Sequence, residues 1–325
     1  MTETEKTPDQ IAAVLLKYLQ TELGDASLAL DSPLTRLQGG FETLIYRFTL
    51  QGAKAEFSKP LVLRLFPAYH GLEKAGRESA IQNALADQGF PVPRIYFTCT
   101  DLTLLDGAFC IMEFIEGDSM LAAPIEALPV MLGRLQAWLH DIDPRPIVEK
   151  LRERGVNEDR VSWRLAWMNE YAEKSYPWLR DGVRWLLENR PPEPEKLSVC
   201  HGDFHPINIL MKAGTVAGVL DWGSFLIADP ALDVAFTLEL IILIGNRVLP
   251  LTEIDALIEK YLEAYADKRP LAFDRLDYYR VLRCIAALIE GALGQEIWRT
   301  LDIVKNLSDT IHQVTNIRIS PPGIN

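Results

Sequence analysis

The hydrophobic pattern of the chain changes part-way along its length. In the first third, short stretches rich in β-branched and aromatic residues are bounded by Gly, Pro or Asp, which is typical of β-strands. The four strands expected from this pattern are 45–51, 61–66, 92–98 and 108–113. Helical spacing predicts one helix that opens at Thr7-Pro8 and stops at Gly24, and a second helix at 73–87.

After Gly117 the apolar positions follow mainly the helical period. The expected helical stretches are 124–140, 161–189 and, beyond two short strands at 209–211 and 216–221, the chain to about residue 313. Four aromatic side chains in the second stretch are expected to form a core stripe: Trp163, Trp167, Tyr171 and Trp178. The sequence therefore predicts an α+β protein with a small strand-rich half, 1–115, and a larger, mostly helical half, 116–325.

Composition and charge narrow the classes of function. The 325 residues are 48% hydrophobic and 24% charged, and they carry a formal net charge of −12. That charge argues against binding to nucleic acid, which needs basic patches. No apolar run approaches the ~20 residues that a membrane-spanning helix needs, and the polar, acidic N-terminus is unlike a secretory leader. We therefore expect a cytoplasmic protein with no membrane or nucleic-acid partner.

Two features of the sequence bear on metal binding. The cysteines form no C-x-x-C pair and predict core positions rather than a zinc site or a disulfide framework: Cys99, Cys110, Cys200 and Cys284. In the segment "HGDFH", His201, Asp203 and His205 would face one way on an extended strand, as metal ligands do. Pro206 directly after them favours a loop instead. A metallohydrolase that uses this cluster stays open as an alternative.

The same segment has a second interpretation, as a catalytic loop. His201, Asp203 and Asn208 have the spacing H-x-D-x-x-x-x-N, in which the aspartate accepts a hydrogen bond from an acceptor hydroxyl and the asparagine binds magnesium. Because Mg²⁺ prefers oxygen ligands, a second carboxylate should follow nearby. Asp221, at the end of an apolar strand and followed by Trp222-Gly223, matches the D-F-G pattern with tryptophan for phenylalanine. Together the two motifs predict phosphoryl transfer.

The strand-rich half carries candidate nucleotide-binding residues. Gly39-Gly40 precede a strand, where backbone can approach phosphates closely. Arg64 lies in the apolar strand "LVLRLF", and a cation among apolar side chains needs an anion. Phosphate and Glu78 are its expected partners, unless the strand lies at an edge and the arginine reaches solvent. The segment "CIMEFIEG" at 110–117 resembles a hinge whose backbone groups bind a purine edge.

These segments resemble the aminoglycoside phosphotransferase and choline kinase family, small-molecule relatives of protein kinases. The resemblance rests on Gly39-Gly40, Arg64, Glu78, "IMEFIEG", "HGDFHPINIL" and "VLDWGSFLIADPALDVA". It implies a two-lobed, protein-kinase-like fold with a small antiparallel sheet in the N-terminal lobe and a mostly helical C-terminal lobe. It also implies ATP and Mg²⁺ as cofactors, with GTP as the other donor considered.

The resemblance implies roles for individual residues as well. Asp203 would be the catalytic base, and Asn208 and Asp221 the magnesium ligands. Glu113 and Ile115 would offer backbone contacts to the nucleotide base. Two further acidic residues, Asp229 and Asp233, would hold the catalytic loop and the following helix together.

Two points stay open at this stage. The family usually has lysine where this chain has Arg64, so a nucleotide-binding pseudokinase with a regulatory role is a further alternative. The stretch 224–229 is much shorter than the docking loop of protein kinases, which predicts a small-molecule hydroxyl as acceptor. An aminoglycoside, another antibiotic or an amino-alcohol would fit. Acidic residues on the late helices, such as Asp277 and Glu290, are candidates to line a pocket for an amine.

Overall fold

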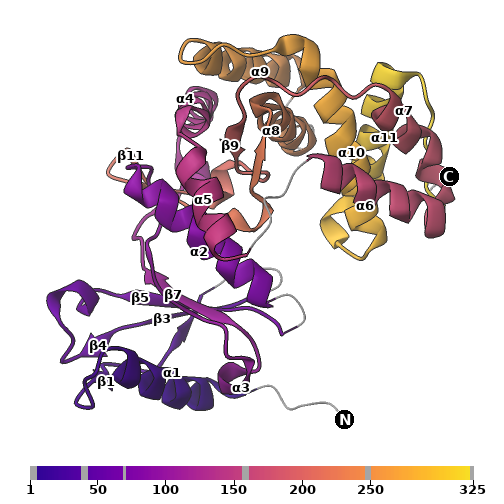
Figure 1. Ribbon diagram of the computed structural model, residues 1–325. Coiled ribbons are helices and arrows are strands. Elements are labelled where there is room, and N and C mark those ends of the chain that lie inside the picture. The colour runs from indigo at the N-terminus through magenta and orange to yellow at the C-terminus, as the bar shows by residue number, and fades with distance from the viewer. Residues whose placement is uncertain (1–5, 38–42, 69–70, 156–160, 246–249, 323–325) are drawn as a thin grey trace. The chain divides into compact units, whose positions relative to one another are not determined.

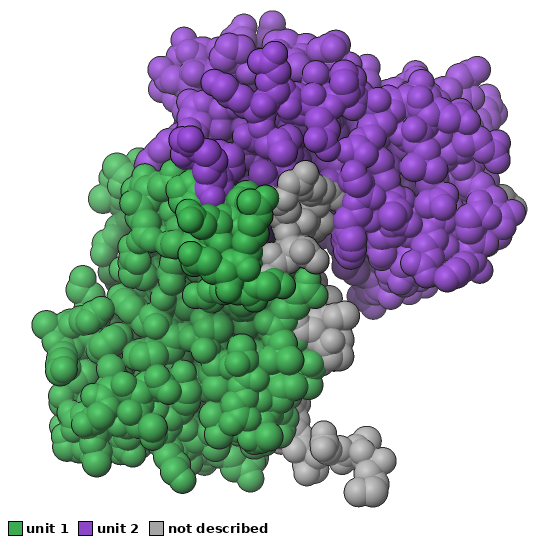
Figure 2. All heavy atoms as spheres, viewed as in Figure 1, with its two compact units in different colours: residues 1–118, 146–157, 209–223 green, residues 119–145, 158–208, 224–325 purple. Residues whose placement is uncertain are grey.

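The chain forms two compact units, each assembled from separate segments of the sequence. The computed structural model describes residues 6–37, 43–68, 71–155, 161–245 and 250–322. Unit 1 comprises 1–118, 146–157 and 209–223, and unit 2 comprises 119–145, 158–208 and 224–325 (Figure 2). The division expected between 115 and 116 stays a prediction.

Unit 1 is built on a five-stranded antiparallel sheet with the order β2-β3-β5-β7-β6. Its strands are β2 (Thr35–Arg36), β3 (Leu44–Phe48), β5 (Leu61–Leu65), β7 (Phe109–Glu113) and β6 (Ile95–Cys99). β6 begins later than expected, because Pro93 supplies no N–H to a strand ladder. β5 lies between β3 and β7, so Arg64 is on a central strand and the edge-strand interpretation is wrong.

Two helices cover opposite faces of this sheet, α1 (Pro8–Glu22) and α2 (Gly71–Asp87) (Figure 1). Leu61, Leu63 and Leu65 pack with buried side chains of α1 such as Leu15. Val62 and Phe66, on the other face, pack with Ala75 of α2. This is the alternation expected for β5, and it turns Arg64 toward α2.

Shorter elements complete unit 1. They are β1 (Ala29–Leu30) with its partner β4 (Leu50–Gln51), α3 (Leu102–Leu105), α5 (Arg145–Glu153) and the hairpin of β10 (Ile209–Lys212) and β11 (Thr215–Val219). The hairpin packs closely against the segment after β7. A Cβ atom at Gly117 would lie 2.6 Å from the carbonyl oxygen of Met211, and one at Gly218 would lie 2.5 Å from Ile115 Cδ1. These glycines let the two segments approach.

Unit 2 is mostly helical. Its helices are α4 (Leu128–Asp141), α6 (Val161–Lys174), α7 (Arg180–Glu188), α8 (Pro230–Gly245), α9 (Leu251–Ala266), α10 (Leu276–Ala292) and α11 (Leu301–Thr315). β9 (Ser198–Cys200) pairs antiparallel with β12 (Leu226–Ala228), and β8 (Asp118–Ser119) lies where the chain passes from unit 1 to unit 2. No helix in the described parts of the chain has the length and apolar character needed to cross a bilayer. The predicted α+β class, with a small antiparallel sheet and a mostly helical remainder, is confirmed.

The aromatic core stripe expected over 161–189 is wrong. Trp163 is 61% exposed, and Trp167, Tyr171 and Trp178 are only partly buried. The buried face of α6 is instead an aliphatic line of Val161, Leu165, Met168 and Ala172. The helix also ends at Lys174, and a short 3₁₀ turn that begins at Pro177 separates it from α7. The expected core position of the cysteines is confirmed, since all four are free and buried.

Candidate functional site

In unit 1, Arg64 connects three separate segments through its guanidinium group. Its Nη1 donates to Glu78 Oε2 on α2 at 2.6 Å, and its Nη2 donates to Asp221 Oδ1 at 3.2 Å. Its Nε lies 3.4 Å from Thr43 Oγ1. A lysine ammonium at one point could not match this spread of donors, so arginine has a distinct role here.

The two carboxylates that Arg64 contacts differ in environment. Glu78 is 2% exposed, and this burial raises its pKa to about 7, although the charge of Arg64 acts in the opposite direction. The Asp221 side chain is 47% exposed and its φ is +62°, a left-handed conformation that non-glycine residues rarely adopt. Glu78 therefore anchors Arg64 from inside, while Asp221 remains open to a ligand.

The residue after Asp221 holds it in place. Trp222 is fully buried, and its Nε1 donates to the carbonyl oxygen of Val219 at 3.0 Å. Its ring meets Phe90 edge-to-face with centroids 6.1 Å apart. Tryptophan thus fills the position of phenylalanine in the D-F-G pattern as a core anchor, with a hydrogen bond that phenylalanine could not make.

The other nucleotide-binding candidates of unit 1 lie in two places. Glu113 ends β7, and its N–H donates to the carbonyl oxygen of Arg94 at 2.9 Å, so that N–H is not available to a ligand. Ile115 follows it and packs on Gly218 of the hairpin. Gly39 and Gly40 lie outside the described residues.

In unit 2, the segment after β9 forms a loop rather than a strand. Asp233 of α8 accepts the N–H groups of His201 and Gly202 at 2.9 and 2.7 Å. Gly202 has φ +78°, and a Cβ atom there would lie 2.2 Å from the carbonyl oxygen of Ser224. The chain can therefore turn only with glycine at this position. The expectation that His201, Asp203 and His205 would share one face of a strand is wrong, and the metallohydrolase loses its support.

The turn presents Asp203 with its carboxylate 37% exposed. Its Oδ2 atom lies 3.3 Å from His205 Nε2 and 3.3 Å from Asn208 Nδ2. The same Asn208 nitrogen donates to the carbonyl oxygen of Asp203 at 3.0 Å. Burial alone would raise the pKa of Asp203, but the hydrogen bond from His205, together with nearby positive charge that includes Arg283, lowers it to about 2.

A buried network beneath the loop supports it. His140 Nε2 lies 3.1 Å from Asp233 Oδ2, and His140 Nδ1 lies 2.7 Å from the Tyr265 hydroxyl. Among the described residues, His140, Cys200 and Asp233 have side-chain atoms within 4.8 Å of one another, as a metal site would need. The Cys200 thiol lies 3.6 Å from the carbonyl oxygen of Asp229, so every member already has a protein partner. The cluster is structural.

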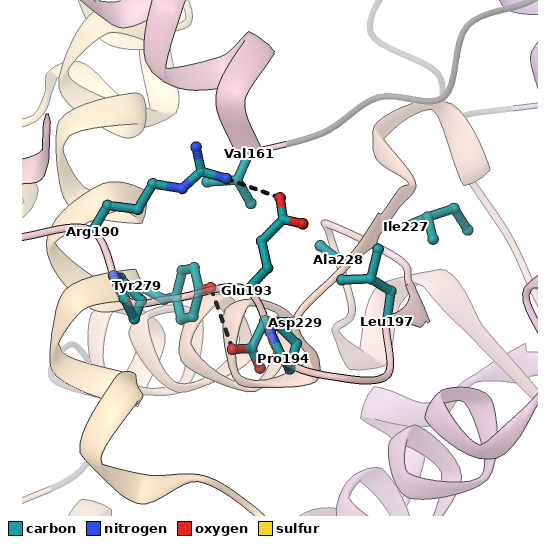
Figure 3. Close-up of a pocket in the computed structure, with 10 residues that line it drawn as sticks. Val161, Arg190, Glu193, Pro194, Leu197, Ile227, Ala228, Asp229 and Tyr279 are labelled. Atoms are coloured by element: carbon teal, nitrogen blue, oxygen red, sulfur yellow. Dashed lines mark hydrogen bonds and ion pairs between the residues drawn. The ribbon is translucent and has the colours of Figure 1, made fainter.

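Asp229 anchors the start of α8 beside a small pocket (Figure 3). Its Oδ1 accepts the N–H of Ala231 at 3.0 Å, and its Oδ2 lies 2.6 Å from Arg275 Nη1 and 3.4 Å from the Tyr279 hydroxyl. Across the pocket, Arg190 pairs with Glu193 at 3.2 Å. The acidic and basic side chains that line the pocket are thus paired. Asp233 connects the loop and α8, as the resemblance implied, whereas the carboxylate of Asp229 connects the start of α8 to Arg275 and Tyr279.

Arg283 of α10 is a residue that the sequence reasoning missed. It is 6% exposed, and its Nη1 lies 3.2 Å from both carboxylate oxygens of Glu290. Its Cζ lies 5.5 Å from the ring centre of Phe236 and 4.6 Å from that of Trp298. The charge of Arg283 also helps to lower the pKa of Asp203. A lone arginine within the apolar run "VLRCIAALI" was the available signal.

Comparison with known proteins agrees with the motifs in both units. The sequence profile of the phosphotransferase enzyme family matches residues 33–279. The chain belongs to this family. An aminoglycoside 3'-phosphotransferase of Streptomyces fradiae is 31% identical over 208 residues, which are 58% of this chain and 72% of that protein.

Part of a much longer protein is similar over a comparable length. Acyl-CoA dehydrogenase family member 11 of Pongo abelii is 28% identical over 219 residues, which are 63% of this chain but 26% of that protein. The chain thus spans about a quarter of the length of that relative.

Two solved phosphotransferase structures share the fold at low sequence identity. One is a ternary complex of a thermostable aminoglycoside phosphotransferase mutant with AMP-PNP and hygromycin B. It aligns with a TM-score of 0.63 and 17% sequence identity, and the alignment covers 94% of this chain and 99% of that chain. A macrolide 2'-phosphotransferase of Brachybacterium faecium has a TM-score of 0.60 and 19% identity, and covers 91% and 97%. The likeness confirms the predicted kinase-like fold.

Proposed function

We propose that this chain transfers the γ-phosphoryl group of ATP to a hydroxyl group of a small molecule, with Asp203 as the base. The arrangement around Asp203 carries the proposal. Asn208 and His205 contact Oδ2, whereas Oδ1 has no hydrogen-bond partner among the described residues. The lowered pKa keeps the carboxylate ionised at neutral pH. An oriented, ionised carboxylate with one free oxygen suits a general base.

In the proposed reaction the acceptor hydroxyl donates a hydrogen bond to Oδ1 of Asp203. The hydroxyl oxygen forms a bond to the γ-phosphorus while the bond from that phosphorus to the bridging oxygen of the β-phosphate breaks. ADP leaves with the electron pair, and the hydroxyl proton passes to Asp203. In a loose phosphoryl-transfer transition state, the main contribution of such a base is to orient the attacking oxygen.

We assign Asn208 and Asp221 as magnesium ligands. The side-chain nitrogen of Asn208 donates to Asp203, which leaves its amide oxygen without a partner among the described residues. Asp221 is half-exposed and contacts Arg64 through Oδ1. Amide and carboxylate oxygens suit Mg²⁺. A bound Mg²⁺ would neutralise charge on the nucleotide phosphates.

We assign the nucleotide to residues of unit 1. Arg64 is the proposed phosphate-binding cation. Its ion pair with buried Glu78 supports this role, because the pair holds the guanidinium in place and leaves other N–H groups of Arg64 able to donate. Gly39 and Gly40 are the proposed phosphate-contacting backbone. The carbonyl oxygen of Glu113 and the backbone of Ile115 are the proposed contacts to the purine. ATP is the proposed donor, with GTP as the second nucleotide to test.

The acceptor is proposed to be an antibiotic or an amino-alcohol. The relative from Streptomyces fradiae is named for aminoglycosides and one structural neighbour for macrolides. The acidic residues considered for amine binding are less available than the sequence suggested, since Glu290 pairs with Arg283 and Asp277 with Arg280. This pairing favours acceptors with few amines over strongly polycationic ones.

An acceptor screen tests the proposed function. The protein is incubated with Mg²⁺ and γ-labelled ATP or GTP against a panel of amino sugars, macrolides and amino-alcohols, and products are read by mass spectrometry. We expect one class to gain a single phosphoryl group on a hydroxyl, and only with Mg²⁺ present. Nucleotide binding without any transfer, even to water, would instead indicate a pseudokinase.

We also propose that the reaction takes place in the cytoplasm, where ATP is supplied. The free state of all four buried cysteines supports a reducing compartment. Fractionation of cells that express the tagged protein tests this, and recovery outside the cytoplasm would contradict it.

A further inference from the structure

His205 lies beside the proposed base but has no role in the H-x-D-x-x-x-x-N pattern. Its side chain is 16% exposed, and its Nε2 lies 3.3 Å from Asp203 Oδ2. Its Nδ1 is buried and has no hydrogen-bond partner among the described residues. A ring with one nitrogen on a carboxylate and the other in an unpartnered, buried position needs an explanation.

The partners of His205 fix which ring nitrogen carries the hydrogen. The ionised Asp203 carboxylate can only accept hydrogen bonds, so Nε2 must be the donor. A hydrogen on Nδ1 as well would be a buried donor without an acceptor, which is costly. Asn208 Nδ2 lies 3.3 Å from the same Nε2 but can give both of its hydrogens to Asp203. Geometry therefore indicates the neutral ring with its hydrogen on Nε2.

The backbone around His205 is held on both sides. Phe204 is fully buried, and its carbonyl oxygen accepts from the Thr237 hydroxyl at 2.9 Å. The carbonyl oxygen of His205 accepts the N–H of Asn208 at 3.0 Å. Pro206 restricts the backbone of His205, and the carbonyl oxygen of Pro206 accepts from Ser119 Oγ at 3.0 Å. The ring thus projects from a loop with little freedom to move.

We propose that His205 is a positioning residue for Asp203: its Nε2–H bond holds Oδ2 and so directs Oδ1 toward the acceptor hydroxyl. The inference rests on the proposed function, because it gives His205 a task in that reaction. It adds a second donor to the one that Asn208 supplies.

Three variants separate positioning from packing. His205→Gln keeps an amide N–H near the position of Nε2, whereas His205→Leu fills similar space without a donor. His312→Leu is the matched control, since His312 also has a buried Nδ1 without a partner in the described parts of the chain but lies on α11. The readout is turnover of Mg·ATP with water as acceptor, together with KM for ATP and thermal stability.

We expect His205→Leu to lower kcat by on the order of tenfold to a hundredfold, the effect of one lost hydrogen bond to a charged group. KM for ATP should stay within about twofold, and His205→Gln should regain most of kcat. His312→Leu should keep kcat. Equal loss of kcat in His205→Gln and His205→Leu would overturn the positioning role of His205 but not the proposed function. No turnover by the wild type, either with water or with any acceptor of the screen, would overturn the proposed function and the catalytic role with it.

A spectroscopic measurement tests the contact without any turnover. In protein labelled with ¹⁵N-histidine, the His205 signals are assigned by their absence from His205→Gln. We expect a protonated Nε2 and an unprotonated Nδ1, and a shift of the Nε2–H proton in Asp203→Ala. An unprotonated Nε2, or a proton signal that Asp203→Ala leaves unchanged, would overturn the inference even if the enzyme is active.

Discussion

Arg64 on β5 and Glu78 on α2 form a buried ion pair, with 2.6 Å between Nη1 and Oε2 and side chains 12% and 3% exposed. Removal of the arginine would leave a buried carboxylate without its cation. We therefore expect Arg64→Ala to lower the free energy of unfolding by about 3 kcal/mol, measured by chemical denaturation. Arg94→Ala is the control, because Arg94 and its partner Asp87 are 44% and 47% exposed. Arg94→Ala should lower the free energy of unfolding by less than about 1 kcal/mol. Equal losses would contradict a buried role for Arg64.

Arg64→Lys tests the fork of donors rather than the charge. Lysine keeps the cation but cannot reach Glu78 and Asp221 from separate nitrogens, as Nη1 and Nη2 of Arg64 do. We expect ATP binding to weaken by roughly tenfold, equivalent to about 1.4 kcal/mol, with a smaller loss of stability than in Arg64→Ala. Isothermal titration with Mg·ATP measures it. Unchanged or tighter binding would show that a point charge is sufficient at this position.

Gly202→Ala tests the turn that presents Asp203. Gly202 has φ +78°, and an added Cβ would meet the Ser224 carbonyl oxygen at 2.2 Å. Gly214 has nearly the same φ, +79°, but open space around it, which makes Gly214→Ala a matched control for backbone strain alone. We expect about 1 kcal/mol of destabilisation for Gly214→Ala and at least about 3 kcal/mol, with loss of activity, for Gly202→Ala. Similar thermal shifts in the two variants would argue against the close contact.

Asp233→Asn tests the support of the loop. The asparagine keeps one acceptor oxygen for two backbone N–H groups, those of His201 and Gly202. One N–H then lies buried without a partner, and we expect a loss of about 2 kcal/mol at pH 7.

The difference in stability between the wild type and Asp233→Asn should depend on pH. Burial alone would raise the pKa of Asp233, but the hydrogen bond and charge of His140, together with the other loop contacts, lower it below its ordinary value. The stability that Asp233 supplies is therefore complete above pH ~4 and is lost as pH falls through the lowered pKa. Denaturation from pH 7 down to pH 3 should show the difference between wild type and Asp233→Asn shrinking. A constant difference would contradict the ionised state of Asp233.

Local patterns predicted the parts of this fold that depend on neighbours in sequence. Thr7 caps α1 in a reciprocal capping box with Gln10, as its place before Pro8 indicated. The alternation in "LVLRLF" placed Arg64 on the α2 side, because the period of a strand decides the face of each residue. The spacing of the H-x-D-x-x-x-x-N motif likewise predicted that Asp203 and Asn208 lie together, and their side chains are in contact.

Long-range features could not be predicted in the same way. Helical spacing put Trp163 on a stripe, but only tertiary packing decides which stripe of α6 is buried, and aliphatic Leu165 and Met168 occupy it. Arg283 is far from Asp203 in sequence, and nothing local shows that its charge acts on that carboxylate. The bond of His205 to Asp203 depends on a turn that Gly202 and Pro206 create together.

The central claim is that Asp203 is the base of a phosphoryl-transfer reaction. Asp203→Asn keeps the size of the side chain and removes the charge, so it tests the claim most directly when turnover of Mg·ATP and nucleotide affinity are measured on the same preparation. We predict a loss of kcat by about 10²- to 10⁴-fold, with ATP affinity within about twofold of the wild type. Turnover near the wild-type rate in folded Asp203→Asn would contradict the account.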